Sequence, residues 1–409
     1  MSATRLKFVA EIIAGQSPPL EHVSGLQQGL PFLQGNAEFG EANPRARLEC
    51  SRAPKLAKKG DLLLSVRAPV GALNVADQDY GIGRGLNAIR ARSIDSRYVF
   101  WLLSDSRSYL DSVATGSTFA AVTAANVGSI AVPFTSPSDQ RQIADYLDAQ
   151  TAKIDALIGK QERLIETLAE RRQAVISHAV TKGLDPNAPM KESGVVWIGE
   201  APEHWAVGNI RRFASMRTGH TPSRAHPEYW IDCSIPWFTL ADVWQLRAGQ
   251  RYLGDTKGTI SEVGLANSAA ELLPTGTVVL SRTASVGFTG IMPMPMATSQ
   301  DFWNWICGPE LDPTYLWFQF YAMQPHFASI VQGSTHKTIY QGDAASLVVV
   351  APSLSDQKLI VAYLDRETSQ IDALSAKARE MIDVLKERRQ ALISAAVTGK
   401  IDVRPTEAQ

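Results

Sequence analysis

Two stretches of the chain have nearly the same sequence. The first runs DQRQIADYLDAQTAKIDALIGKQERLIETLAERRQAVISHAVTKGLD over residues 139–185. The second runs DQKLIVAYLDRETSQIDALSAKAREMIDVLKERRQALISAAVTGKID over residues 356–402. They align without a gap at an offset of 217 residues, and 25 of the 47 positions are identical. Because a far more divergent segment precedes each copy, the chain is organised as head, helix, head, helix.

Each copy is predicted to be one long helix. Apolar residues recur at alternating spacings of four and three, which is the a/d pattern of pairing helices. Ser138 and Ser355 are the predicted N-caps, and Gly183 and Gly399 the predicted stops, of helices of about 40 residues, or roughly 60 Å. The predicted a/d positions are Ile143, Leu147, Gln150, Ile154, Leu157, Gln161, Leu164 and Leu168 in the first copy, and Ile360, Leu364, Glu367, Ile371, Leu374, Ala378, Met381 and Leu385 in the second.

The short connector between the first helix and the second head favours an antiparallel helix pair. Parallel pairing would require the connector to stretch back at about 3.3 Å per residue. The alternative is that each helix packs only on its own head. The predicted segments are a first head (1–136), a first helix (137–183), a connector (184–205), a second head (206–351) and a second helix (352–402).

The two heads are distant copies of each other. The sequence GDLLLSVRAPVG from Gly60 matches GTVVLSRTASVG from Gly276 at an offset of 216, and the openings around Gly15 and Gly219 match at an offset of 204. Strand-like runs alternate with a helical patch near 96–112 and 313–330, which predicts α+β heads. The fold class is therefore two mixed α/β heads on two long antiparallel coiled-coil helices, with a pseudo-two-fold internal repeat.

Composition indicates a soluble globular protein of 409 residues, with 45% apolar and 20% charged residues. The start of the chain does not resemble a signal peptide and no long apolar run follows, so we expect a cytoplasmic protein. The net charge of −1 does not by itself indicate a polyanionic partner. The first head, however, carries 14 basic against 11 acidic residues, a net of +3.

Several basic residues are candidates for DNA contact, although a solvated surface or a surface ion pair is the alternative for each. A basic run in the first head, residues 45–59, contains a single acidic residue, Glu49, and could contact phosphates. Arg67 and Arg282 lie in the matched Ser-turn segments and could reach guanine edges. The predicted DNA-binding residues are Arg45, Arg47, Arg52, Lys55, Lys58, Lys59, Arg67, Arg84, Arg224, Arg282, His336 and Lys337.

The four-residue sequence ERRQ occurs in both predicted helices, at residues 170–173 and 387–390. It is predicted to dock a partner protein, with ion pairing between the helices as the alternative. The predicted docking residues are Glu170, Arg171, Arg172, Gln173, Glu387, Arg388, Arg389 and Gln390.

No catalytic or metal-binding residue is predicted. The chain contains no [DN]PP[YF] tetrapeptide of an amino-methyltransferase and no GxxxxGK phosphate loop. The glycines of Gly81–Gly85 lack the GxGxxG spacing and indicate a turn. The seven histidines show no metal-ligand spacing, and the three cysteines no CxxC spacing.

Four sequence features occur together in one known family. They are MKESGVVWIGEAPEHW (190–205), IPWFTLADV (235–243), GSTHKTIY (333–340) and the twice-used pattern DQ…IDAL…ERRQA. In these features, and over essentially its whole length, the chain resembles the specificity subunit of type I restriction–modification systems. No counterpart of the connector precedes the first head.

The resemblance implies a non-catalytic subunit that recognises double-stranded DNA. Each head would read one half of a bipartite, asymmetric target, and the helices would fix the gap and dock two methyltransferase subunits. Restriction/translocase subunits would complete an adenine-N6 DNA methyltransferase and ATP-dependent endonuclease. S-adenosylmethionine, ATP and Mg²⁺ would belong to those partners, with no cofactor in this chain and no membrane partner.

Two other functions remain open from the sequence. One is a self-sufficient DNA methyltransferase, which the missing tetrapeptide disfavours. The other is a coiled-coil scaffold with protein- or sugar-binding heads. Sequence-selective DNA binding that weakens with salt would separate these from a DNA-recognition subunit.

Overall fold

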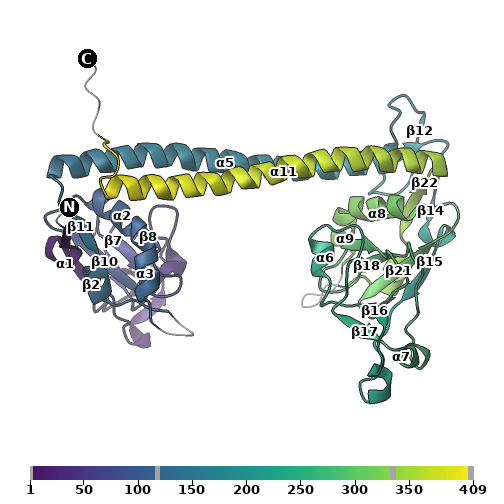
Figure 1. The fold of residues 1–409 in the computed structure, drawn as a ribbon, viewed down its shortest axis with the longest axis horizontal. Coiled ribbons are helices and arrows are strands. Elements are labelled where there is room, and N and C mark those ends of the chain that lie inside the picture. Colours follow the sequence, from purple (N-terminus) through teal and green to yellow (C-terminus); the bar gives the residue numbers. More distant parts are fainter. Residues whose placement is uncertain (1–2, 116–119, 332–337, 404–409) are drawn as a thin grey trace. The chain divides into compact units, whose positions relative to one another are not determined.

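The computed structural model describes residues 3–115, 120–331 and 338–403 (Figure 1). The chain divides into two compact units. Unit 1 comprises residues 1–162 and 379–409, and unit 2 comprises residues 163–378. Each unit contains one head and parts of two long helices, α5 (Pro137–Lys182, 46 residues) and α11 (Leu354–Val397, 44 residues). The protein is therefore a mixed α/β fold with two long helices.

The head of unit 1 is built on a four-stranded antiparallel sheet in the order β2-β10-β7-β8. A five-stranded sheet, β3-β5-β4-β9-β6, and the pair β1-β11 complete it. The strands are β1 (Ala3–Arg5), β2 (Ala10–Ala14), β3 (Val23–Gly25), β4 (Pro31–Leu33), β5 (Leu48–Cys50), β6 (Leu56–Ala57), β7 (Leu62–Ser65), β8 (Leu73–Val75), β9 (Tyr80–Ile82), β10 (Leu86–Ala91) and β11 (Ala131–Pro133). The short helices are α1 (Leu6–Val9), η1 (Leu20–His22), η2 (Asn36–Glu38), α2 (Ser96–Asp105), α3 (Arg107–Val113) and α4 (Ala124–Gly128).

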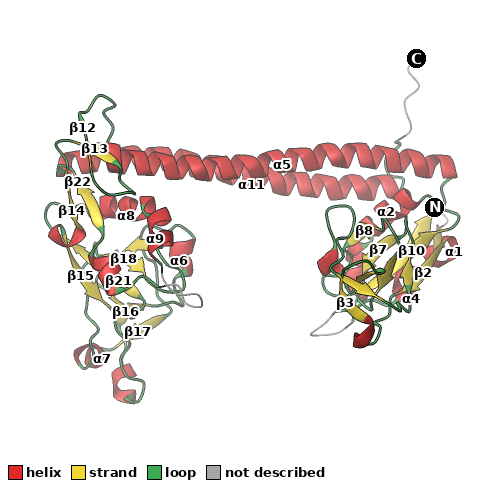
Figure 2. Ribbon diagram, turned by 180° about the vertical axis from the view of Figure 1, so that it is seen from behind, coloured by secondary structure: helices red, strands yellow, loops and turns green. Residues whose placement is uncertain are grey.

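The head of unit 2 is built on a sheet of the same strand order, β15-β21-β18-β19. Figure 2 labels β15, β21 and β18 of this sheet. The head adds the sheet β17-β16-β20 and the pairs β14-β22 and β12-β13. The strands are β12 (Met190–Glu192), β13 (Glu200–Pro202), β14 (Ala206–Asn209), β15 (Ala214–Thr218), β16 (Ile235–Phe238), β17 (Gly258–Ile260), β18 (Val278–Ser281), β19 (Thr289–Ile291), β20 (Ala297–Thr298), β21 (Phe302–Cys307) and β22 (Val348–Ala351). The short helices are η3 (Ile210–Arg212), η4 (Pro227–Trp230), α6 (Trp244–Arg247), α7 (Glu262–Ala266), α8 (Pro313–Ala322), α9 (Gln324–Ile330) and α10 (Gln341–Ala345).

The helical patch of each head begins at an aspartate. The Asp95 carboxylate accepts hydrogen bonds from two backbone amides at the start of α2, and Asp312 does the same at the start of α8. An N-cap of this kind stabilises a helix by about 1 kcal/mol because it satisfies amides that have no partner within the helix. The backbone amides of these aspartates donate in turn to Gln140 of α5 and Gln357 of α11. Each head helix is thereby tied to the first turn of the long helix that follows it.

The two long helices run in opposite directions within each unit. In unit 1, Asp155 of α5 lies 2.9 Å from Arg389 of α11, while Leu147 shares a buried cluster with Ile393. In unit 2, Arg172 of α5 pairs with Asp372 at 3.4 Å, and the start of α11 packs close to the end of α5 in another buried cluster.

The prediction of the a/d seam is wrong at alternate positions, where the residue that follows the predicted one is the more buried. Leu157, Leu164, Leu374 and Met381 are 42–50% exposed, whereas Thr151, Ile158 and Ile165, and their counterparts 217 residues later (Thr368, Ser375 and Ile382), are buried or half-buried. The buried hydroxyls of Thr151 and Thr368 donate to the carbonyl oxygens four residues earlier, which removes the cost of burying them. Hydrophobicity alone therefore predicted the wrong residue of each neighbouring pair to be buried.

The helix caps also differ from the prediction. The Ser136 and Ser353 hydroxyls, each two residues before the predicted caps Ser138 and Ser355, accept the backbone amides of Asp139 and Asp356. Both helices therefore begin before the predicted caps, at Pro137 and Leu354. At the other end the prediction of a stop at Gly183 is confirmed, because α5 ends at Lys182 and Gly183 has a φ of +77°.

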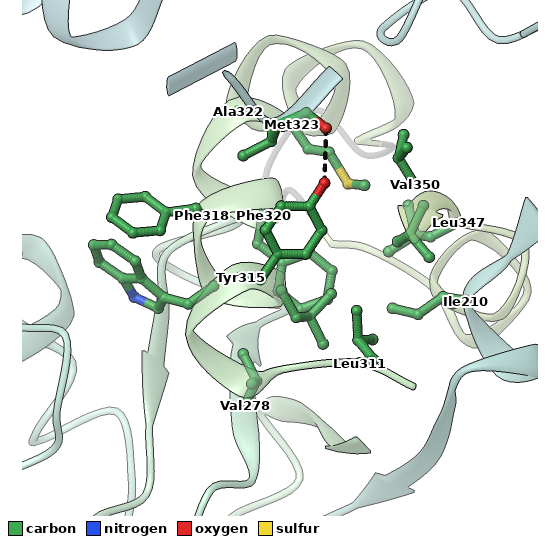
Figure 3. Close-up of a cluster of buried hydrophobic side chains, with 14 of the residues drawn as sticks. Ile210, Val278, Leu311, Tyr315, Phe318, Phe320, Ala322, Met323, Leu347 and Val350 are labelled. Carbon is green, nitrogen blue, oxygen red and sulfur yellow. Dashed lines mark hydrogen bonds between the residues drawn. The ribbon is translucent and has the colours of Figure 1, made fainter. Parts of the chain in front are cut away.

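A tyrosine from each head caps the end of a long helix. The Tyr315 hydroxyl of α8 donates to the Val180 carbonyl oxygen of α5 at 3.0 Å (Figure 3). The Tyr98 hydroxyl of α2 donates to the Val397 carbonyl oxygen of α11 at 3.3 Å. Both carbonyls belong to the last turn, where the helix itself offers no donor. Tyr315 is fully buried among Phe318, Phe320 and other apolar side chains, so head and helix share one core.

Candidate nucleic-acid interface

The basic run of the first head lies on the surface around β5 and β6. Arg45, Arg47, Arg52, Lys55 and Lys59 are exposed, and within the described part of the chain none of them has a carboxylate partner within 4 Å. Lys58 is the exception, because its ammonium lies 2.7 Å from Asp79. That ammonium, together with the backbone amide of Lys59, lowers the pKa of the Asp79 carboxyl. Five of the six cations of this run thus have no ion-pair partner among the described residues and could meet an anionic partner.

Glu49, the acidic residue within this run, is occupied by backbone. Its carboxylate accepts the amides of Gln27 at 2.8 Å and Gly29 at 2.7 Å, and these bonds lower its pKa. The carboxylate thus holds the loop between β3 and β4 and forms no ion pair with the neighbouring cations in the described structure.

Arg67 and Arg84 line one cavity of 310 Å³ in the first head. The cavity lies where β7 ends, and it also includes Gln34, Asn36 and Glu38. The Ser65 hydroxyl donates to the Arg67 carbonyl oxygen at 2.9 Å, which fixes the turn that carries Arg67. The sequence therefore predicted two arginines that the fold brings to one place. The amide side chains beside them, Gln34 and Asn36, were missed because nothing in their spacing marks them.

The second head has a cavity of 610 Å³ at a related place, where β18 ends. It is lined by three arginines, Arg211, Arg217 and Arg282, together with Ser215, Glu271, Trp303 and Gln341. Only Arg282 was predicted. Arg211 and Arg217 were missed because they lie on η3 and β15, about 70 residues from Arg282, and only the sheet joins them.

Arg282 is held in one orientation. Its guanidinium stacks over the Trp303 indole, with Cζ 4.4 Å from the ring centroid, and the indole N–H donates to the Ile339 carbonyl oxygen at 3.0 Å. The Arg282 backbone is bonded on both sides, to Asp301 and to Ile339. Its Nε is buried without a hydrogen-bond partner among the described residues. The cation–π contact contributes about 1 kcal/mol and holds the plane of the guanidinium against the indole.

The remaining DNA-contact candidates are not gathered at this cavity. Arg224 is exposed and stacks over Trp230, with Cζ 5.1 Å from the ring centroid. His336 and Lys337 lie outside the described residues, as do Gly116–Thr118 of the matching loop in the first head.

The ERRQ residues divide into two kinds. Arg172 and Arg389 make the ion pairs between the helices, and they also stack over Tyr321 and Trp101 of the heads. Gln173 donates to the Ala322 carbonyl oxygen, and Gln390 donates to the Asp105 carboxylate. Glu170, Arg171, Glu387 and Arg388 are exposed. Half of the predicted docking residues thus have contacts within the chain, and the exposed half remains available to a partner.

Two of the sequence features that carry the resemblance have structural roles here. In IPWFTLADV, the buried Asp242 accepts hydrogen bonds from the amides of Thr239 and Lys257, which closes the turn after β16. In the connector, the Trp197 indole donates to Val348 of β22 at 3.2 Å, and buried Trp205 packs against Gly183. A Cβ at Gly183 would lie 2.9 Å from the Trp205 ring, so this position requires glycine for space as well as for its φ.

The described residues contain no cluster of three or more His, Cys, Asp or Glu side chains arranged to hold a metal ion. None of the described helices combines the length and the apolar character that crossing a bilayer requires.

The comparisons identify the family. The family model described as "Type I restriction modification DNA specificity domain" matches residues 46–167 and 202–382, which is more than half of the chain. The chain belongs to this family.

Curated relatives and solved structures carry related names. The chain is 35% identical over 173 residues to the "Putative type I restriction enzyme MjaX specificity subunit" of Methanocaldococcus jannaschii, covering 42% of this chain and 40% of that protein. It is 28% identical over 193 residues to the MjaIX specificity subunit of the same organism, covering 46% and 43%. The matched regions thus span less than half the length of these relatives.

Two solved structures share the fold. A chain in "Structural basis underlying complex assembly and conformational transition of the type I R-M system" matches with a TM-score of 0.76 and 18% identity, covering 98% of both chains. The HsdS subunit of Thermoanaerobacter tengcongensis matches with a TM-score of 0.53 and 18% identity, covering 98% of this chain and 97% of that chain.

Proposed function

We propose that this chain is the DNA-recognition subunit of a type I restriction–modification complex and that it has no catalytic activity of its own. Family membership carries this proposal. It is supported by two heads that share one sheet order and one set of contacts with the long helices, while their cavities are lined by different residues. A shared scaffold with unlike cavities suits the recognition of two unlike half-sites, one by each head.

The long helices are proposed to form an antiparallel coiled-coil spacer that sets the gap between the half-sites. The support is that equivalent ion pairs recur in the two units. Asp155 with Arg389 and Asp372 with Arg172 occupy positions that the 217-residue offset interchanges. The pseudo-two-fold repeat and the five-segment division of the chain belong to this same proposal.

Two equivalent exposed patches are proposed to dock one methyltransferase subunit each. In unit 1 the patch is Leu157, Glu387 and Arg388, and in unit 2 it is Leu374, Glu170 and Arg171. Each patch flanks one of the interhelical ion pairs, since each member lies within two residues of a paired side chain. A half-exposed leucine beside charged side chains suits a protein interface with a polar rim. S-adenosylmethionine, ATP and Mg²⁺ would be bound by the partner subunits.

The experiment that tests the function is a map of methylated adenines. The chain is expressed with its native partner subunits in a host that lacks other adenine methylation. We expect N6-methyladenine in a two-part motif with a constant gap, and none when this chain is omitted. Methylation that persists without the chain, or S-adenosylmethionine turnover by the purified chain alone, would contradict the proposal.

A further inference from the structure

We propose that the arginine cavity of the second head binds a backbone phosphate of the DNA. The arginine cavity is the 610 Å³ site lined by Arg211, Arg217 and Arg282. This inference rests on the proposed function, because it names the DNA group that one head contacts. It assigns Arg211 and Arg217, which no sequence pattern marked, to DNA binding.

The distribution of charge in the second head favours an anion at this place. That head carries 9 basic and 10 acidic residues, so it has no net positive charge to attract DNA. Of the charged side chains, three arginines and one carboxylate, Glu271, line this single cavity. Glu271 lies 3.2 Å from Arg217 and neutralises it, whereas Arg211 and Arg282 form no ion pair with any carboxylate of the described residues. The cavity therefore concentrates positive charge on an otherwise balanced surface.

The shape and the hydrogen-bond donors of the cavity favour a phosphate over a base edge. Phosphate groups project from the surface of a duplex and can enter a concave site, whereas base edges lie at the floor of a groove and are met by projecting elements. Arg282 offers a rigid planar fork that suits two phosphate oxygens. The Ser215 hydroxyl and the Gln341 amide line the same cavity and add neutral donors.

The first head supplies its phosphate contacts in another way. At the positions equivalent to Arg282 and Trp303, the first head has Val66 and Asn87, so it cannot form this cavity. It has instead the exposed cations of the basic run, of which five have no carboxylate partner among the described residues. The two heads thus place positive charge at different parts of the same scaffold.

The test compares two neighbouring arginines in the full chain within its native complex. Arg211 lines the cavity, whereas Arg212, the next residue of η3, stacks over Phe213 outside it. Both are exposed, so neither substitution should prevent folding. Binding to the target duplex, known from the methylation map, is measured from 50 to 200 mM salt.

We expect Arg211→Gln to weaken binding on the order of tenfold. The plot of log K against log salt should become shallower by about 0.9, which corresponds to one lost phosphate contact. Arg282→Lys, which keeps the charge but removes the fork, should weaken binding less, and Arg212→Gln should leave the slope unchanged. Glu271→Gln should strengthen binding, because it removes the negative charge from a site for an anion.

Four results would contradict either the phosphate site or the proposed function. An unchanged slope for Arg211→Gln, or weaker binding for Glu271→Gln, would overturn the phosphate site. Loss of discrimination at one base pair without a change of slope would also overturn it, since the cavity would then read a base. If the unmodified complex shows no sequence preference at all, the proposed function itself fails.

Discussion

The two heads keep the same internal contacts and change the surface. Their four-stranded sheets have one strand order, and both tie an N-capping aspartate to a glutamine of a long helix and cap a helix end with a tyrosine. Beside the equivalent serines Ser65 and Ser281, however, the cavities differ. The first is lined by Arg67 and Arg84, whose equivalents at the offset of 216 residues are Thr283 and Gln300. The second is lined by Arg282, whose equivalent in the first head is Val66. The contacts that hold a head to the helices can therefore persist while the cavity residues change, because the two sets of residues do not overlap.

The largest effect should come from exchanging one head. Replacing residues 206–351 by the corresponding head of a relative should change one half of the methylated motif completely and leave the other half unchanged. The physical reason is that the contacts at the helices are common to the two heads while the cavity residues are not. A methylation map in which both halves change, with activity retained, would show that the heads do not read DNA independently.

The second prediction compares the two capping tyrosines. Tyr315→Phe should lower the free energy of unfolding of unit 2 by about 2 kcal/mol, because the buried Val180 carbonyl oxygen loses its donor. Tyr98→Phe should cost unit 1 about 1 kcal/mol, because its hydrogen bond is longer, 3.3 Å against 3.0 Å. Urea unfolding followed by tryptophan fluorescence reports mainly on unit 2, which contains eight of the nine tryptophans. Amide hydrogen exchange reports on unit 1. Equal costs would mean that the difference in hydrogen-bond length does not distinguish the two caps.

The third prediction compares the two interhelical ion pairs. Arg172 is 15% exposed and its Cζ lies 4.5 Å from the Tyr321 ring centroid, whereas Arg389 is 32% exposed and lies 5.7 Å from the Trp101 ring centroid. Arg172→Ala should therefore cost about 1.5 kcal/mol, and Arg389→Ala about 0.5 kcal/mol. Urea unfolding followed by tryptophan fluorescence measures the cost in unit 2, and amide hydrogen exchange measures the cost in unit 1. The ion pair itself is shorter in unit 1, 2.9 Å against 3.4 Å, so a larger cost for Arg389→Ala would show that the ion pair outweighs the burial and the cation–π contact of the arginine.

The smallest effect concerns pH and only the second head. Burial, and secondarily Asp312, raises the pKa of the Cys307 thiol from 9.0 to about 12. Between these values the unfolded chain has lost this proton while the folded chain retains it, so the thiol's contribution to stability falls as pH rises from 9 toward 12. From pH 8 to pH 10, unit 2 should lose about 1 kcal/mol through this group. Cys307→Ala should remove that part of the pH dependence. An identical pH dependence in the variant would show that the thiol is not the group responsible.

The sequence predicted the architecture because its signals are local or repeated. The 217-residue repeat, the helix lengths, the stop at Gly183 and the helical patches of the heads can be read from residues close together in the chain. The family followed from motifs such as IPWFTLADV, whose Asp242 proves to be a buried turn residue. These features depend on backbone preferences and on the order of residues, and both are visible without a fold.

What the tertiary structure decided is which side chains meet. The sequence could not choose between Leu157 and Ile158 as the buried position, because both are apolar and the rotation of a helix is set by what it packs against. It could not join Arg217 to Arg282, since only the pairing of β15 with β21 and of β21 with β18 brings them to one cavity. The repeat determined by itself that there are two heads on two helices. The packing of the sheets and helices decided where each head places its charge.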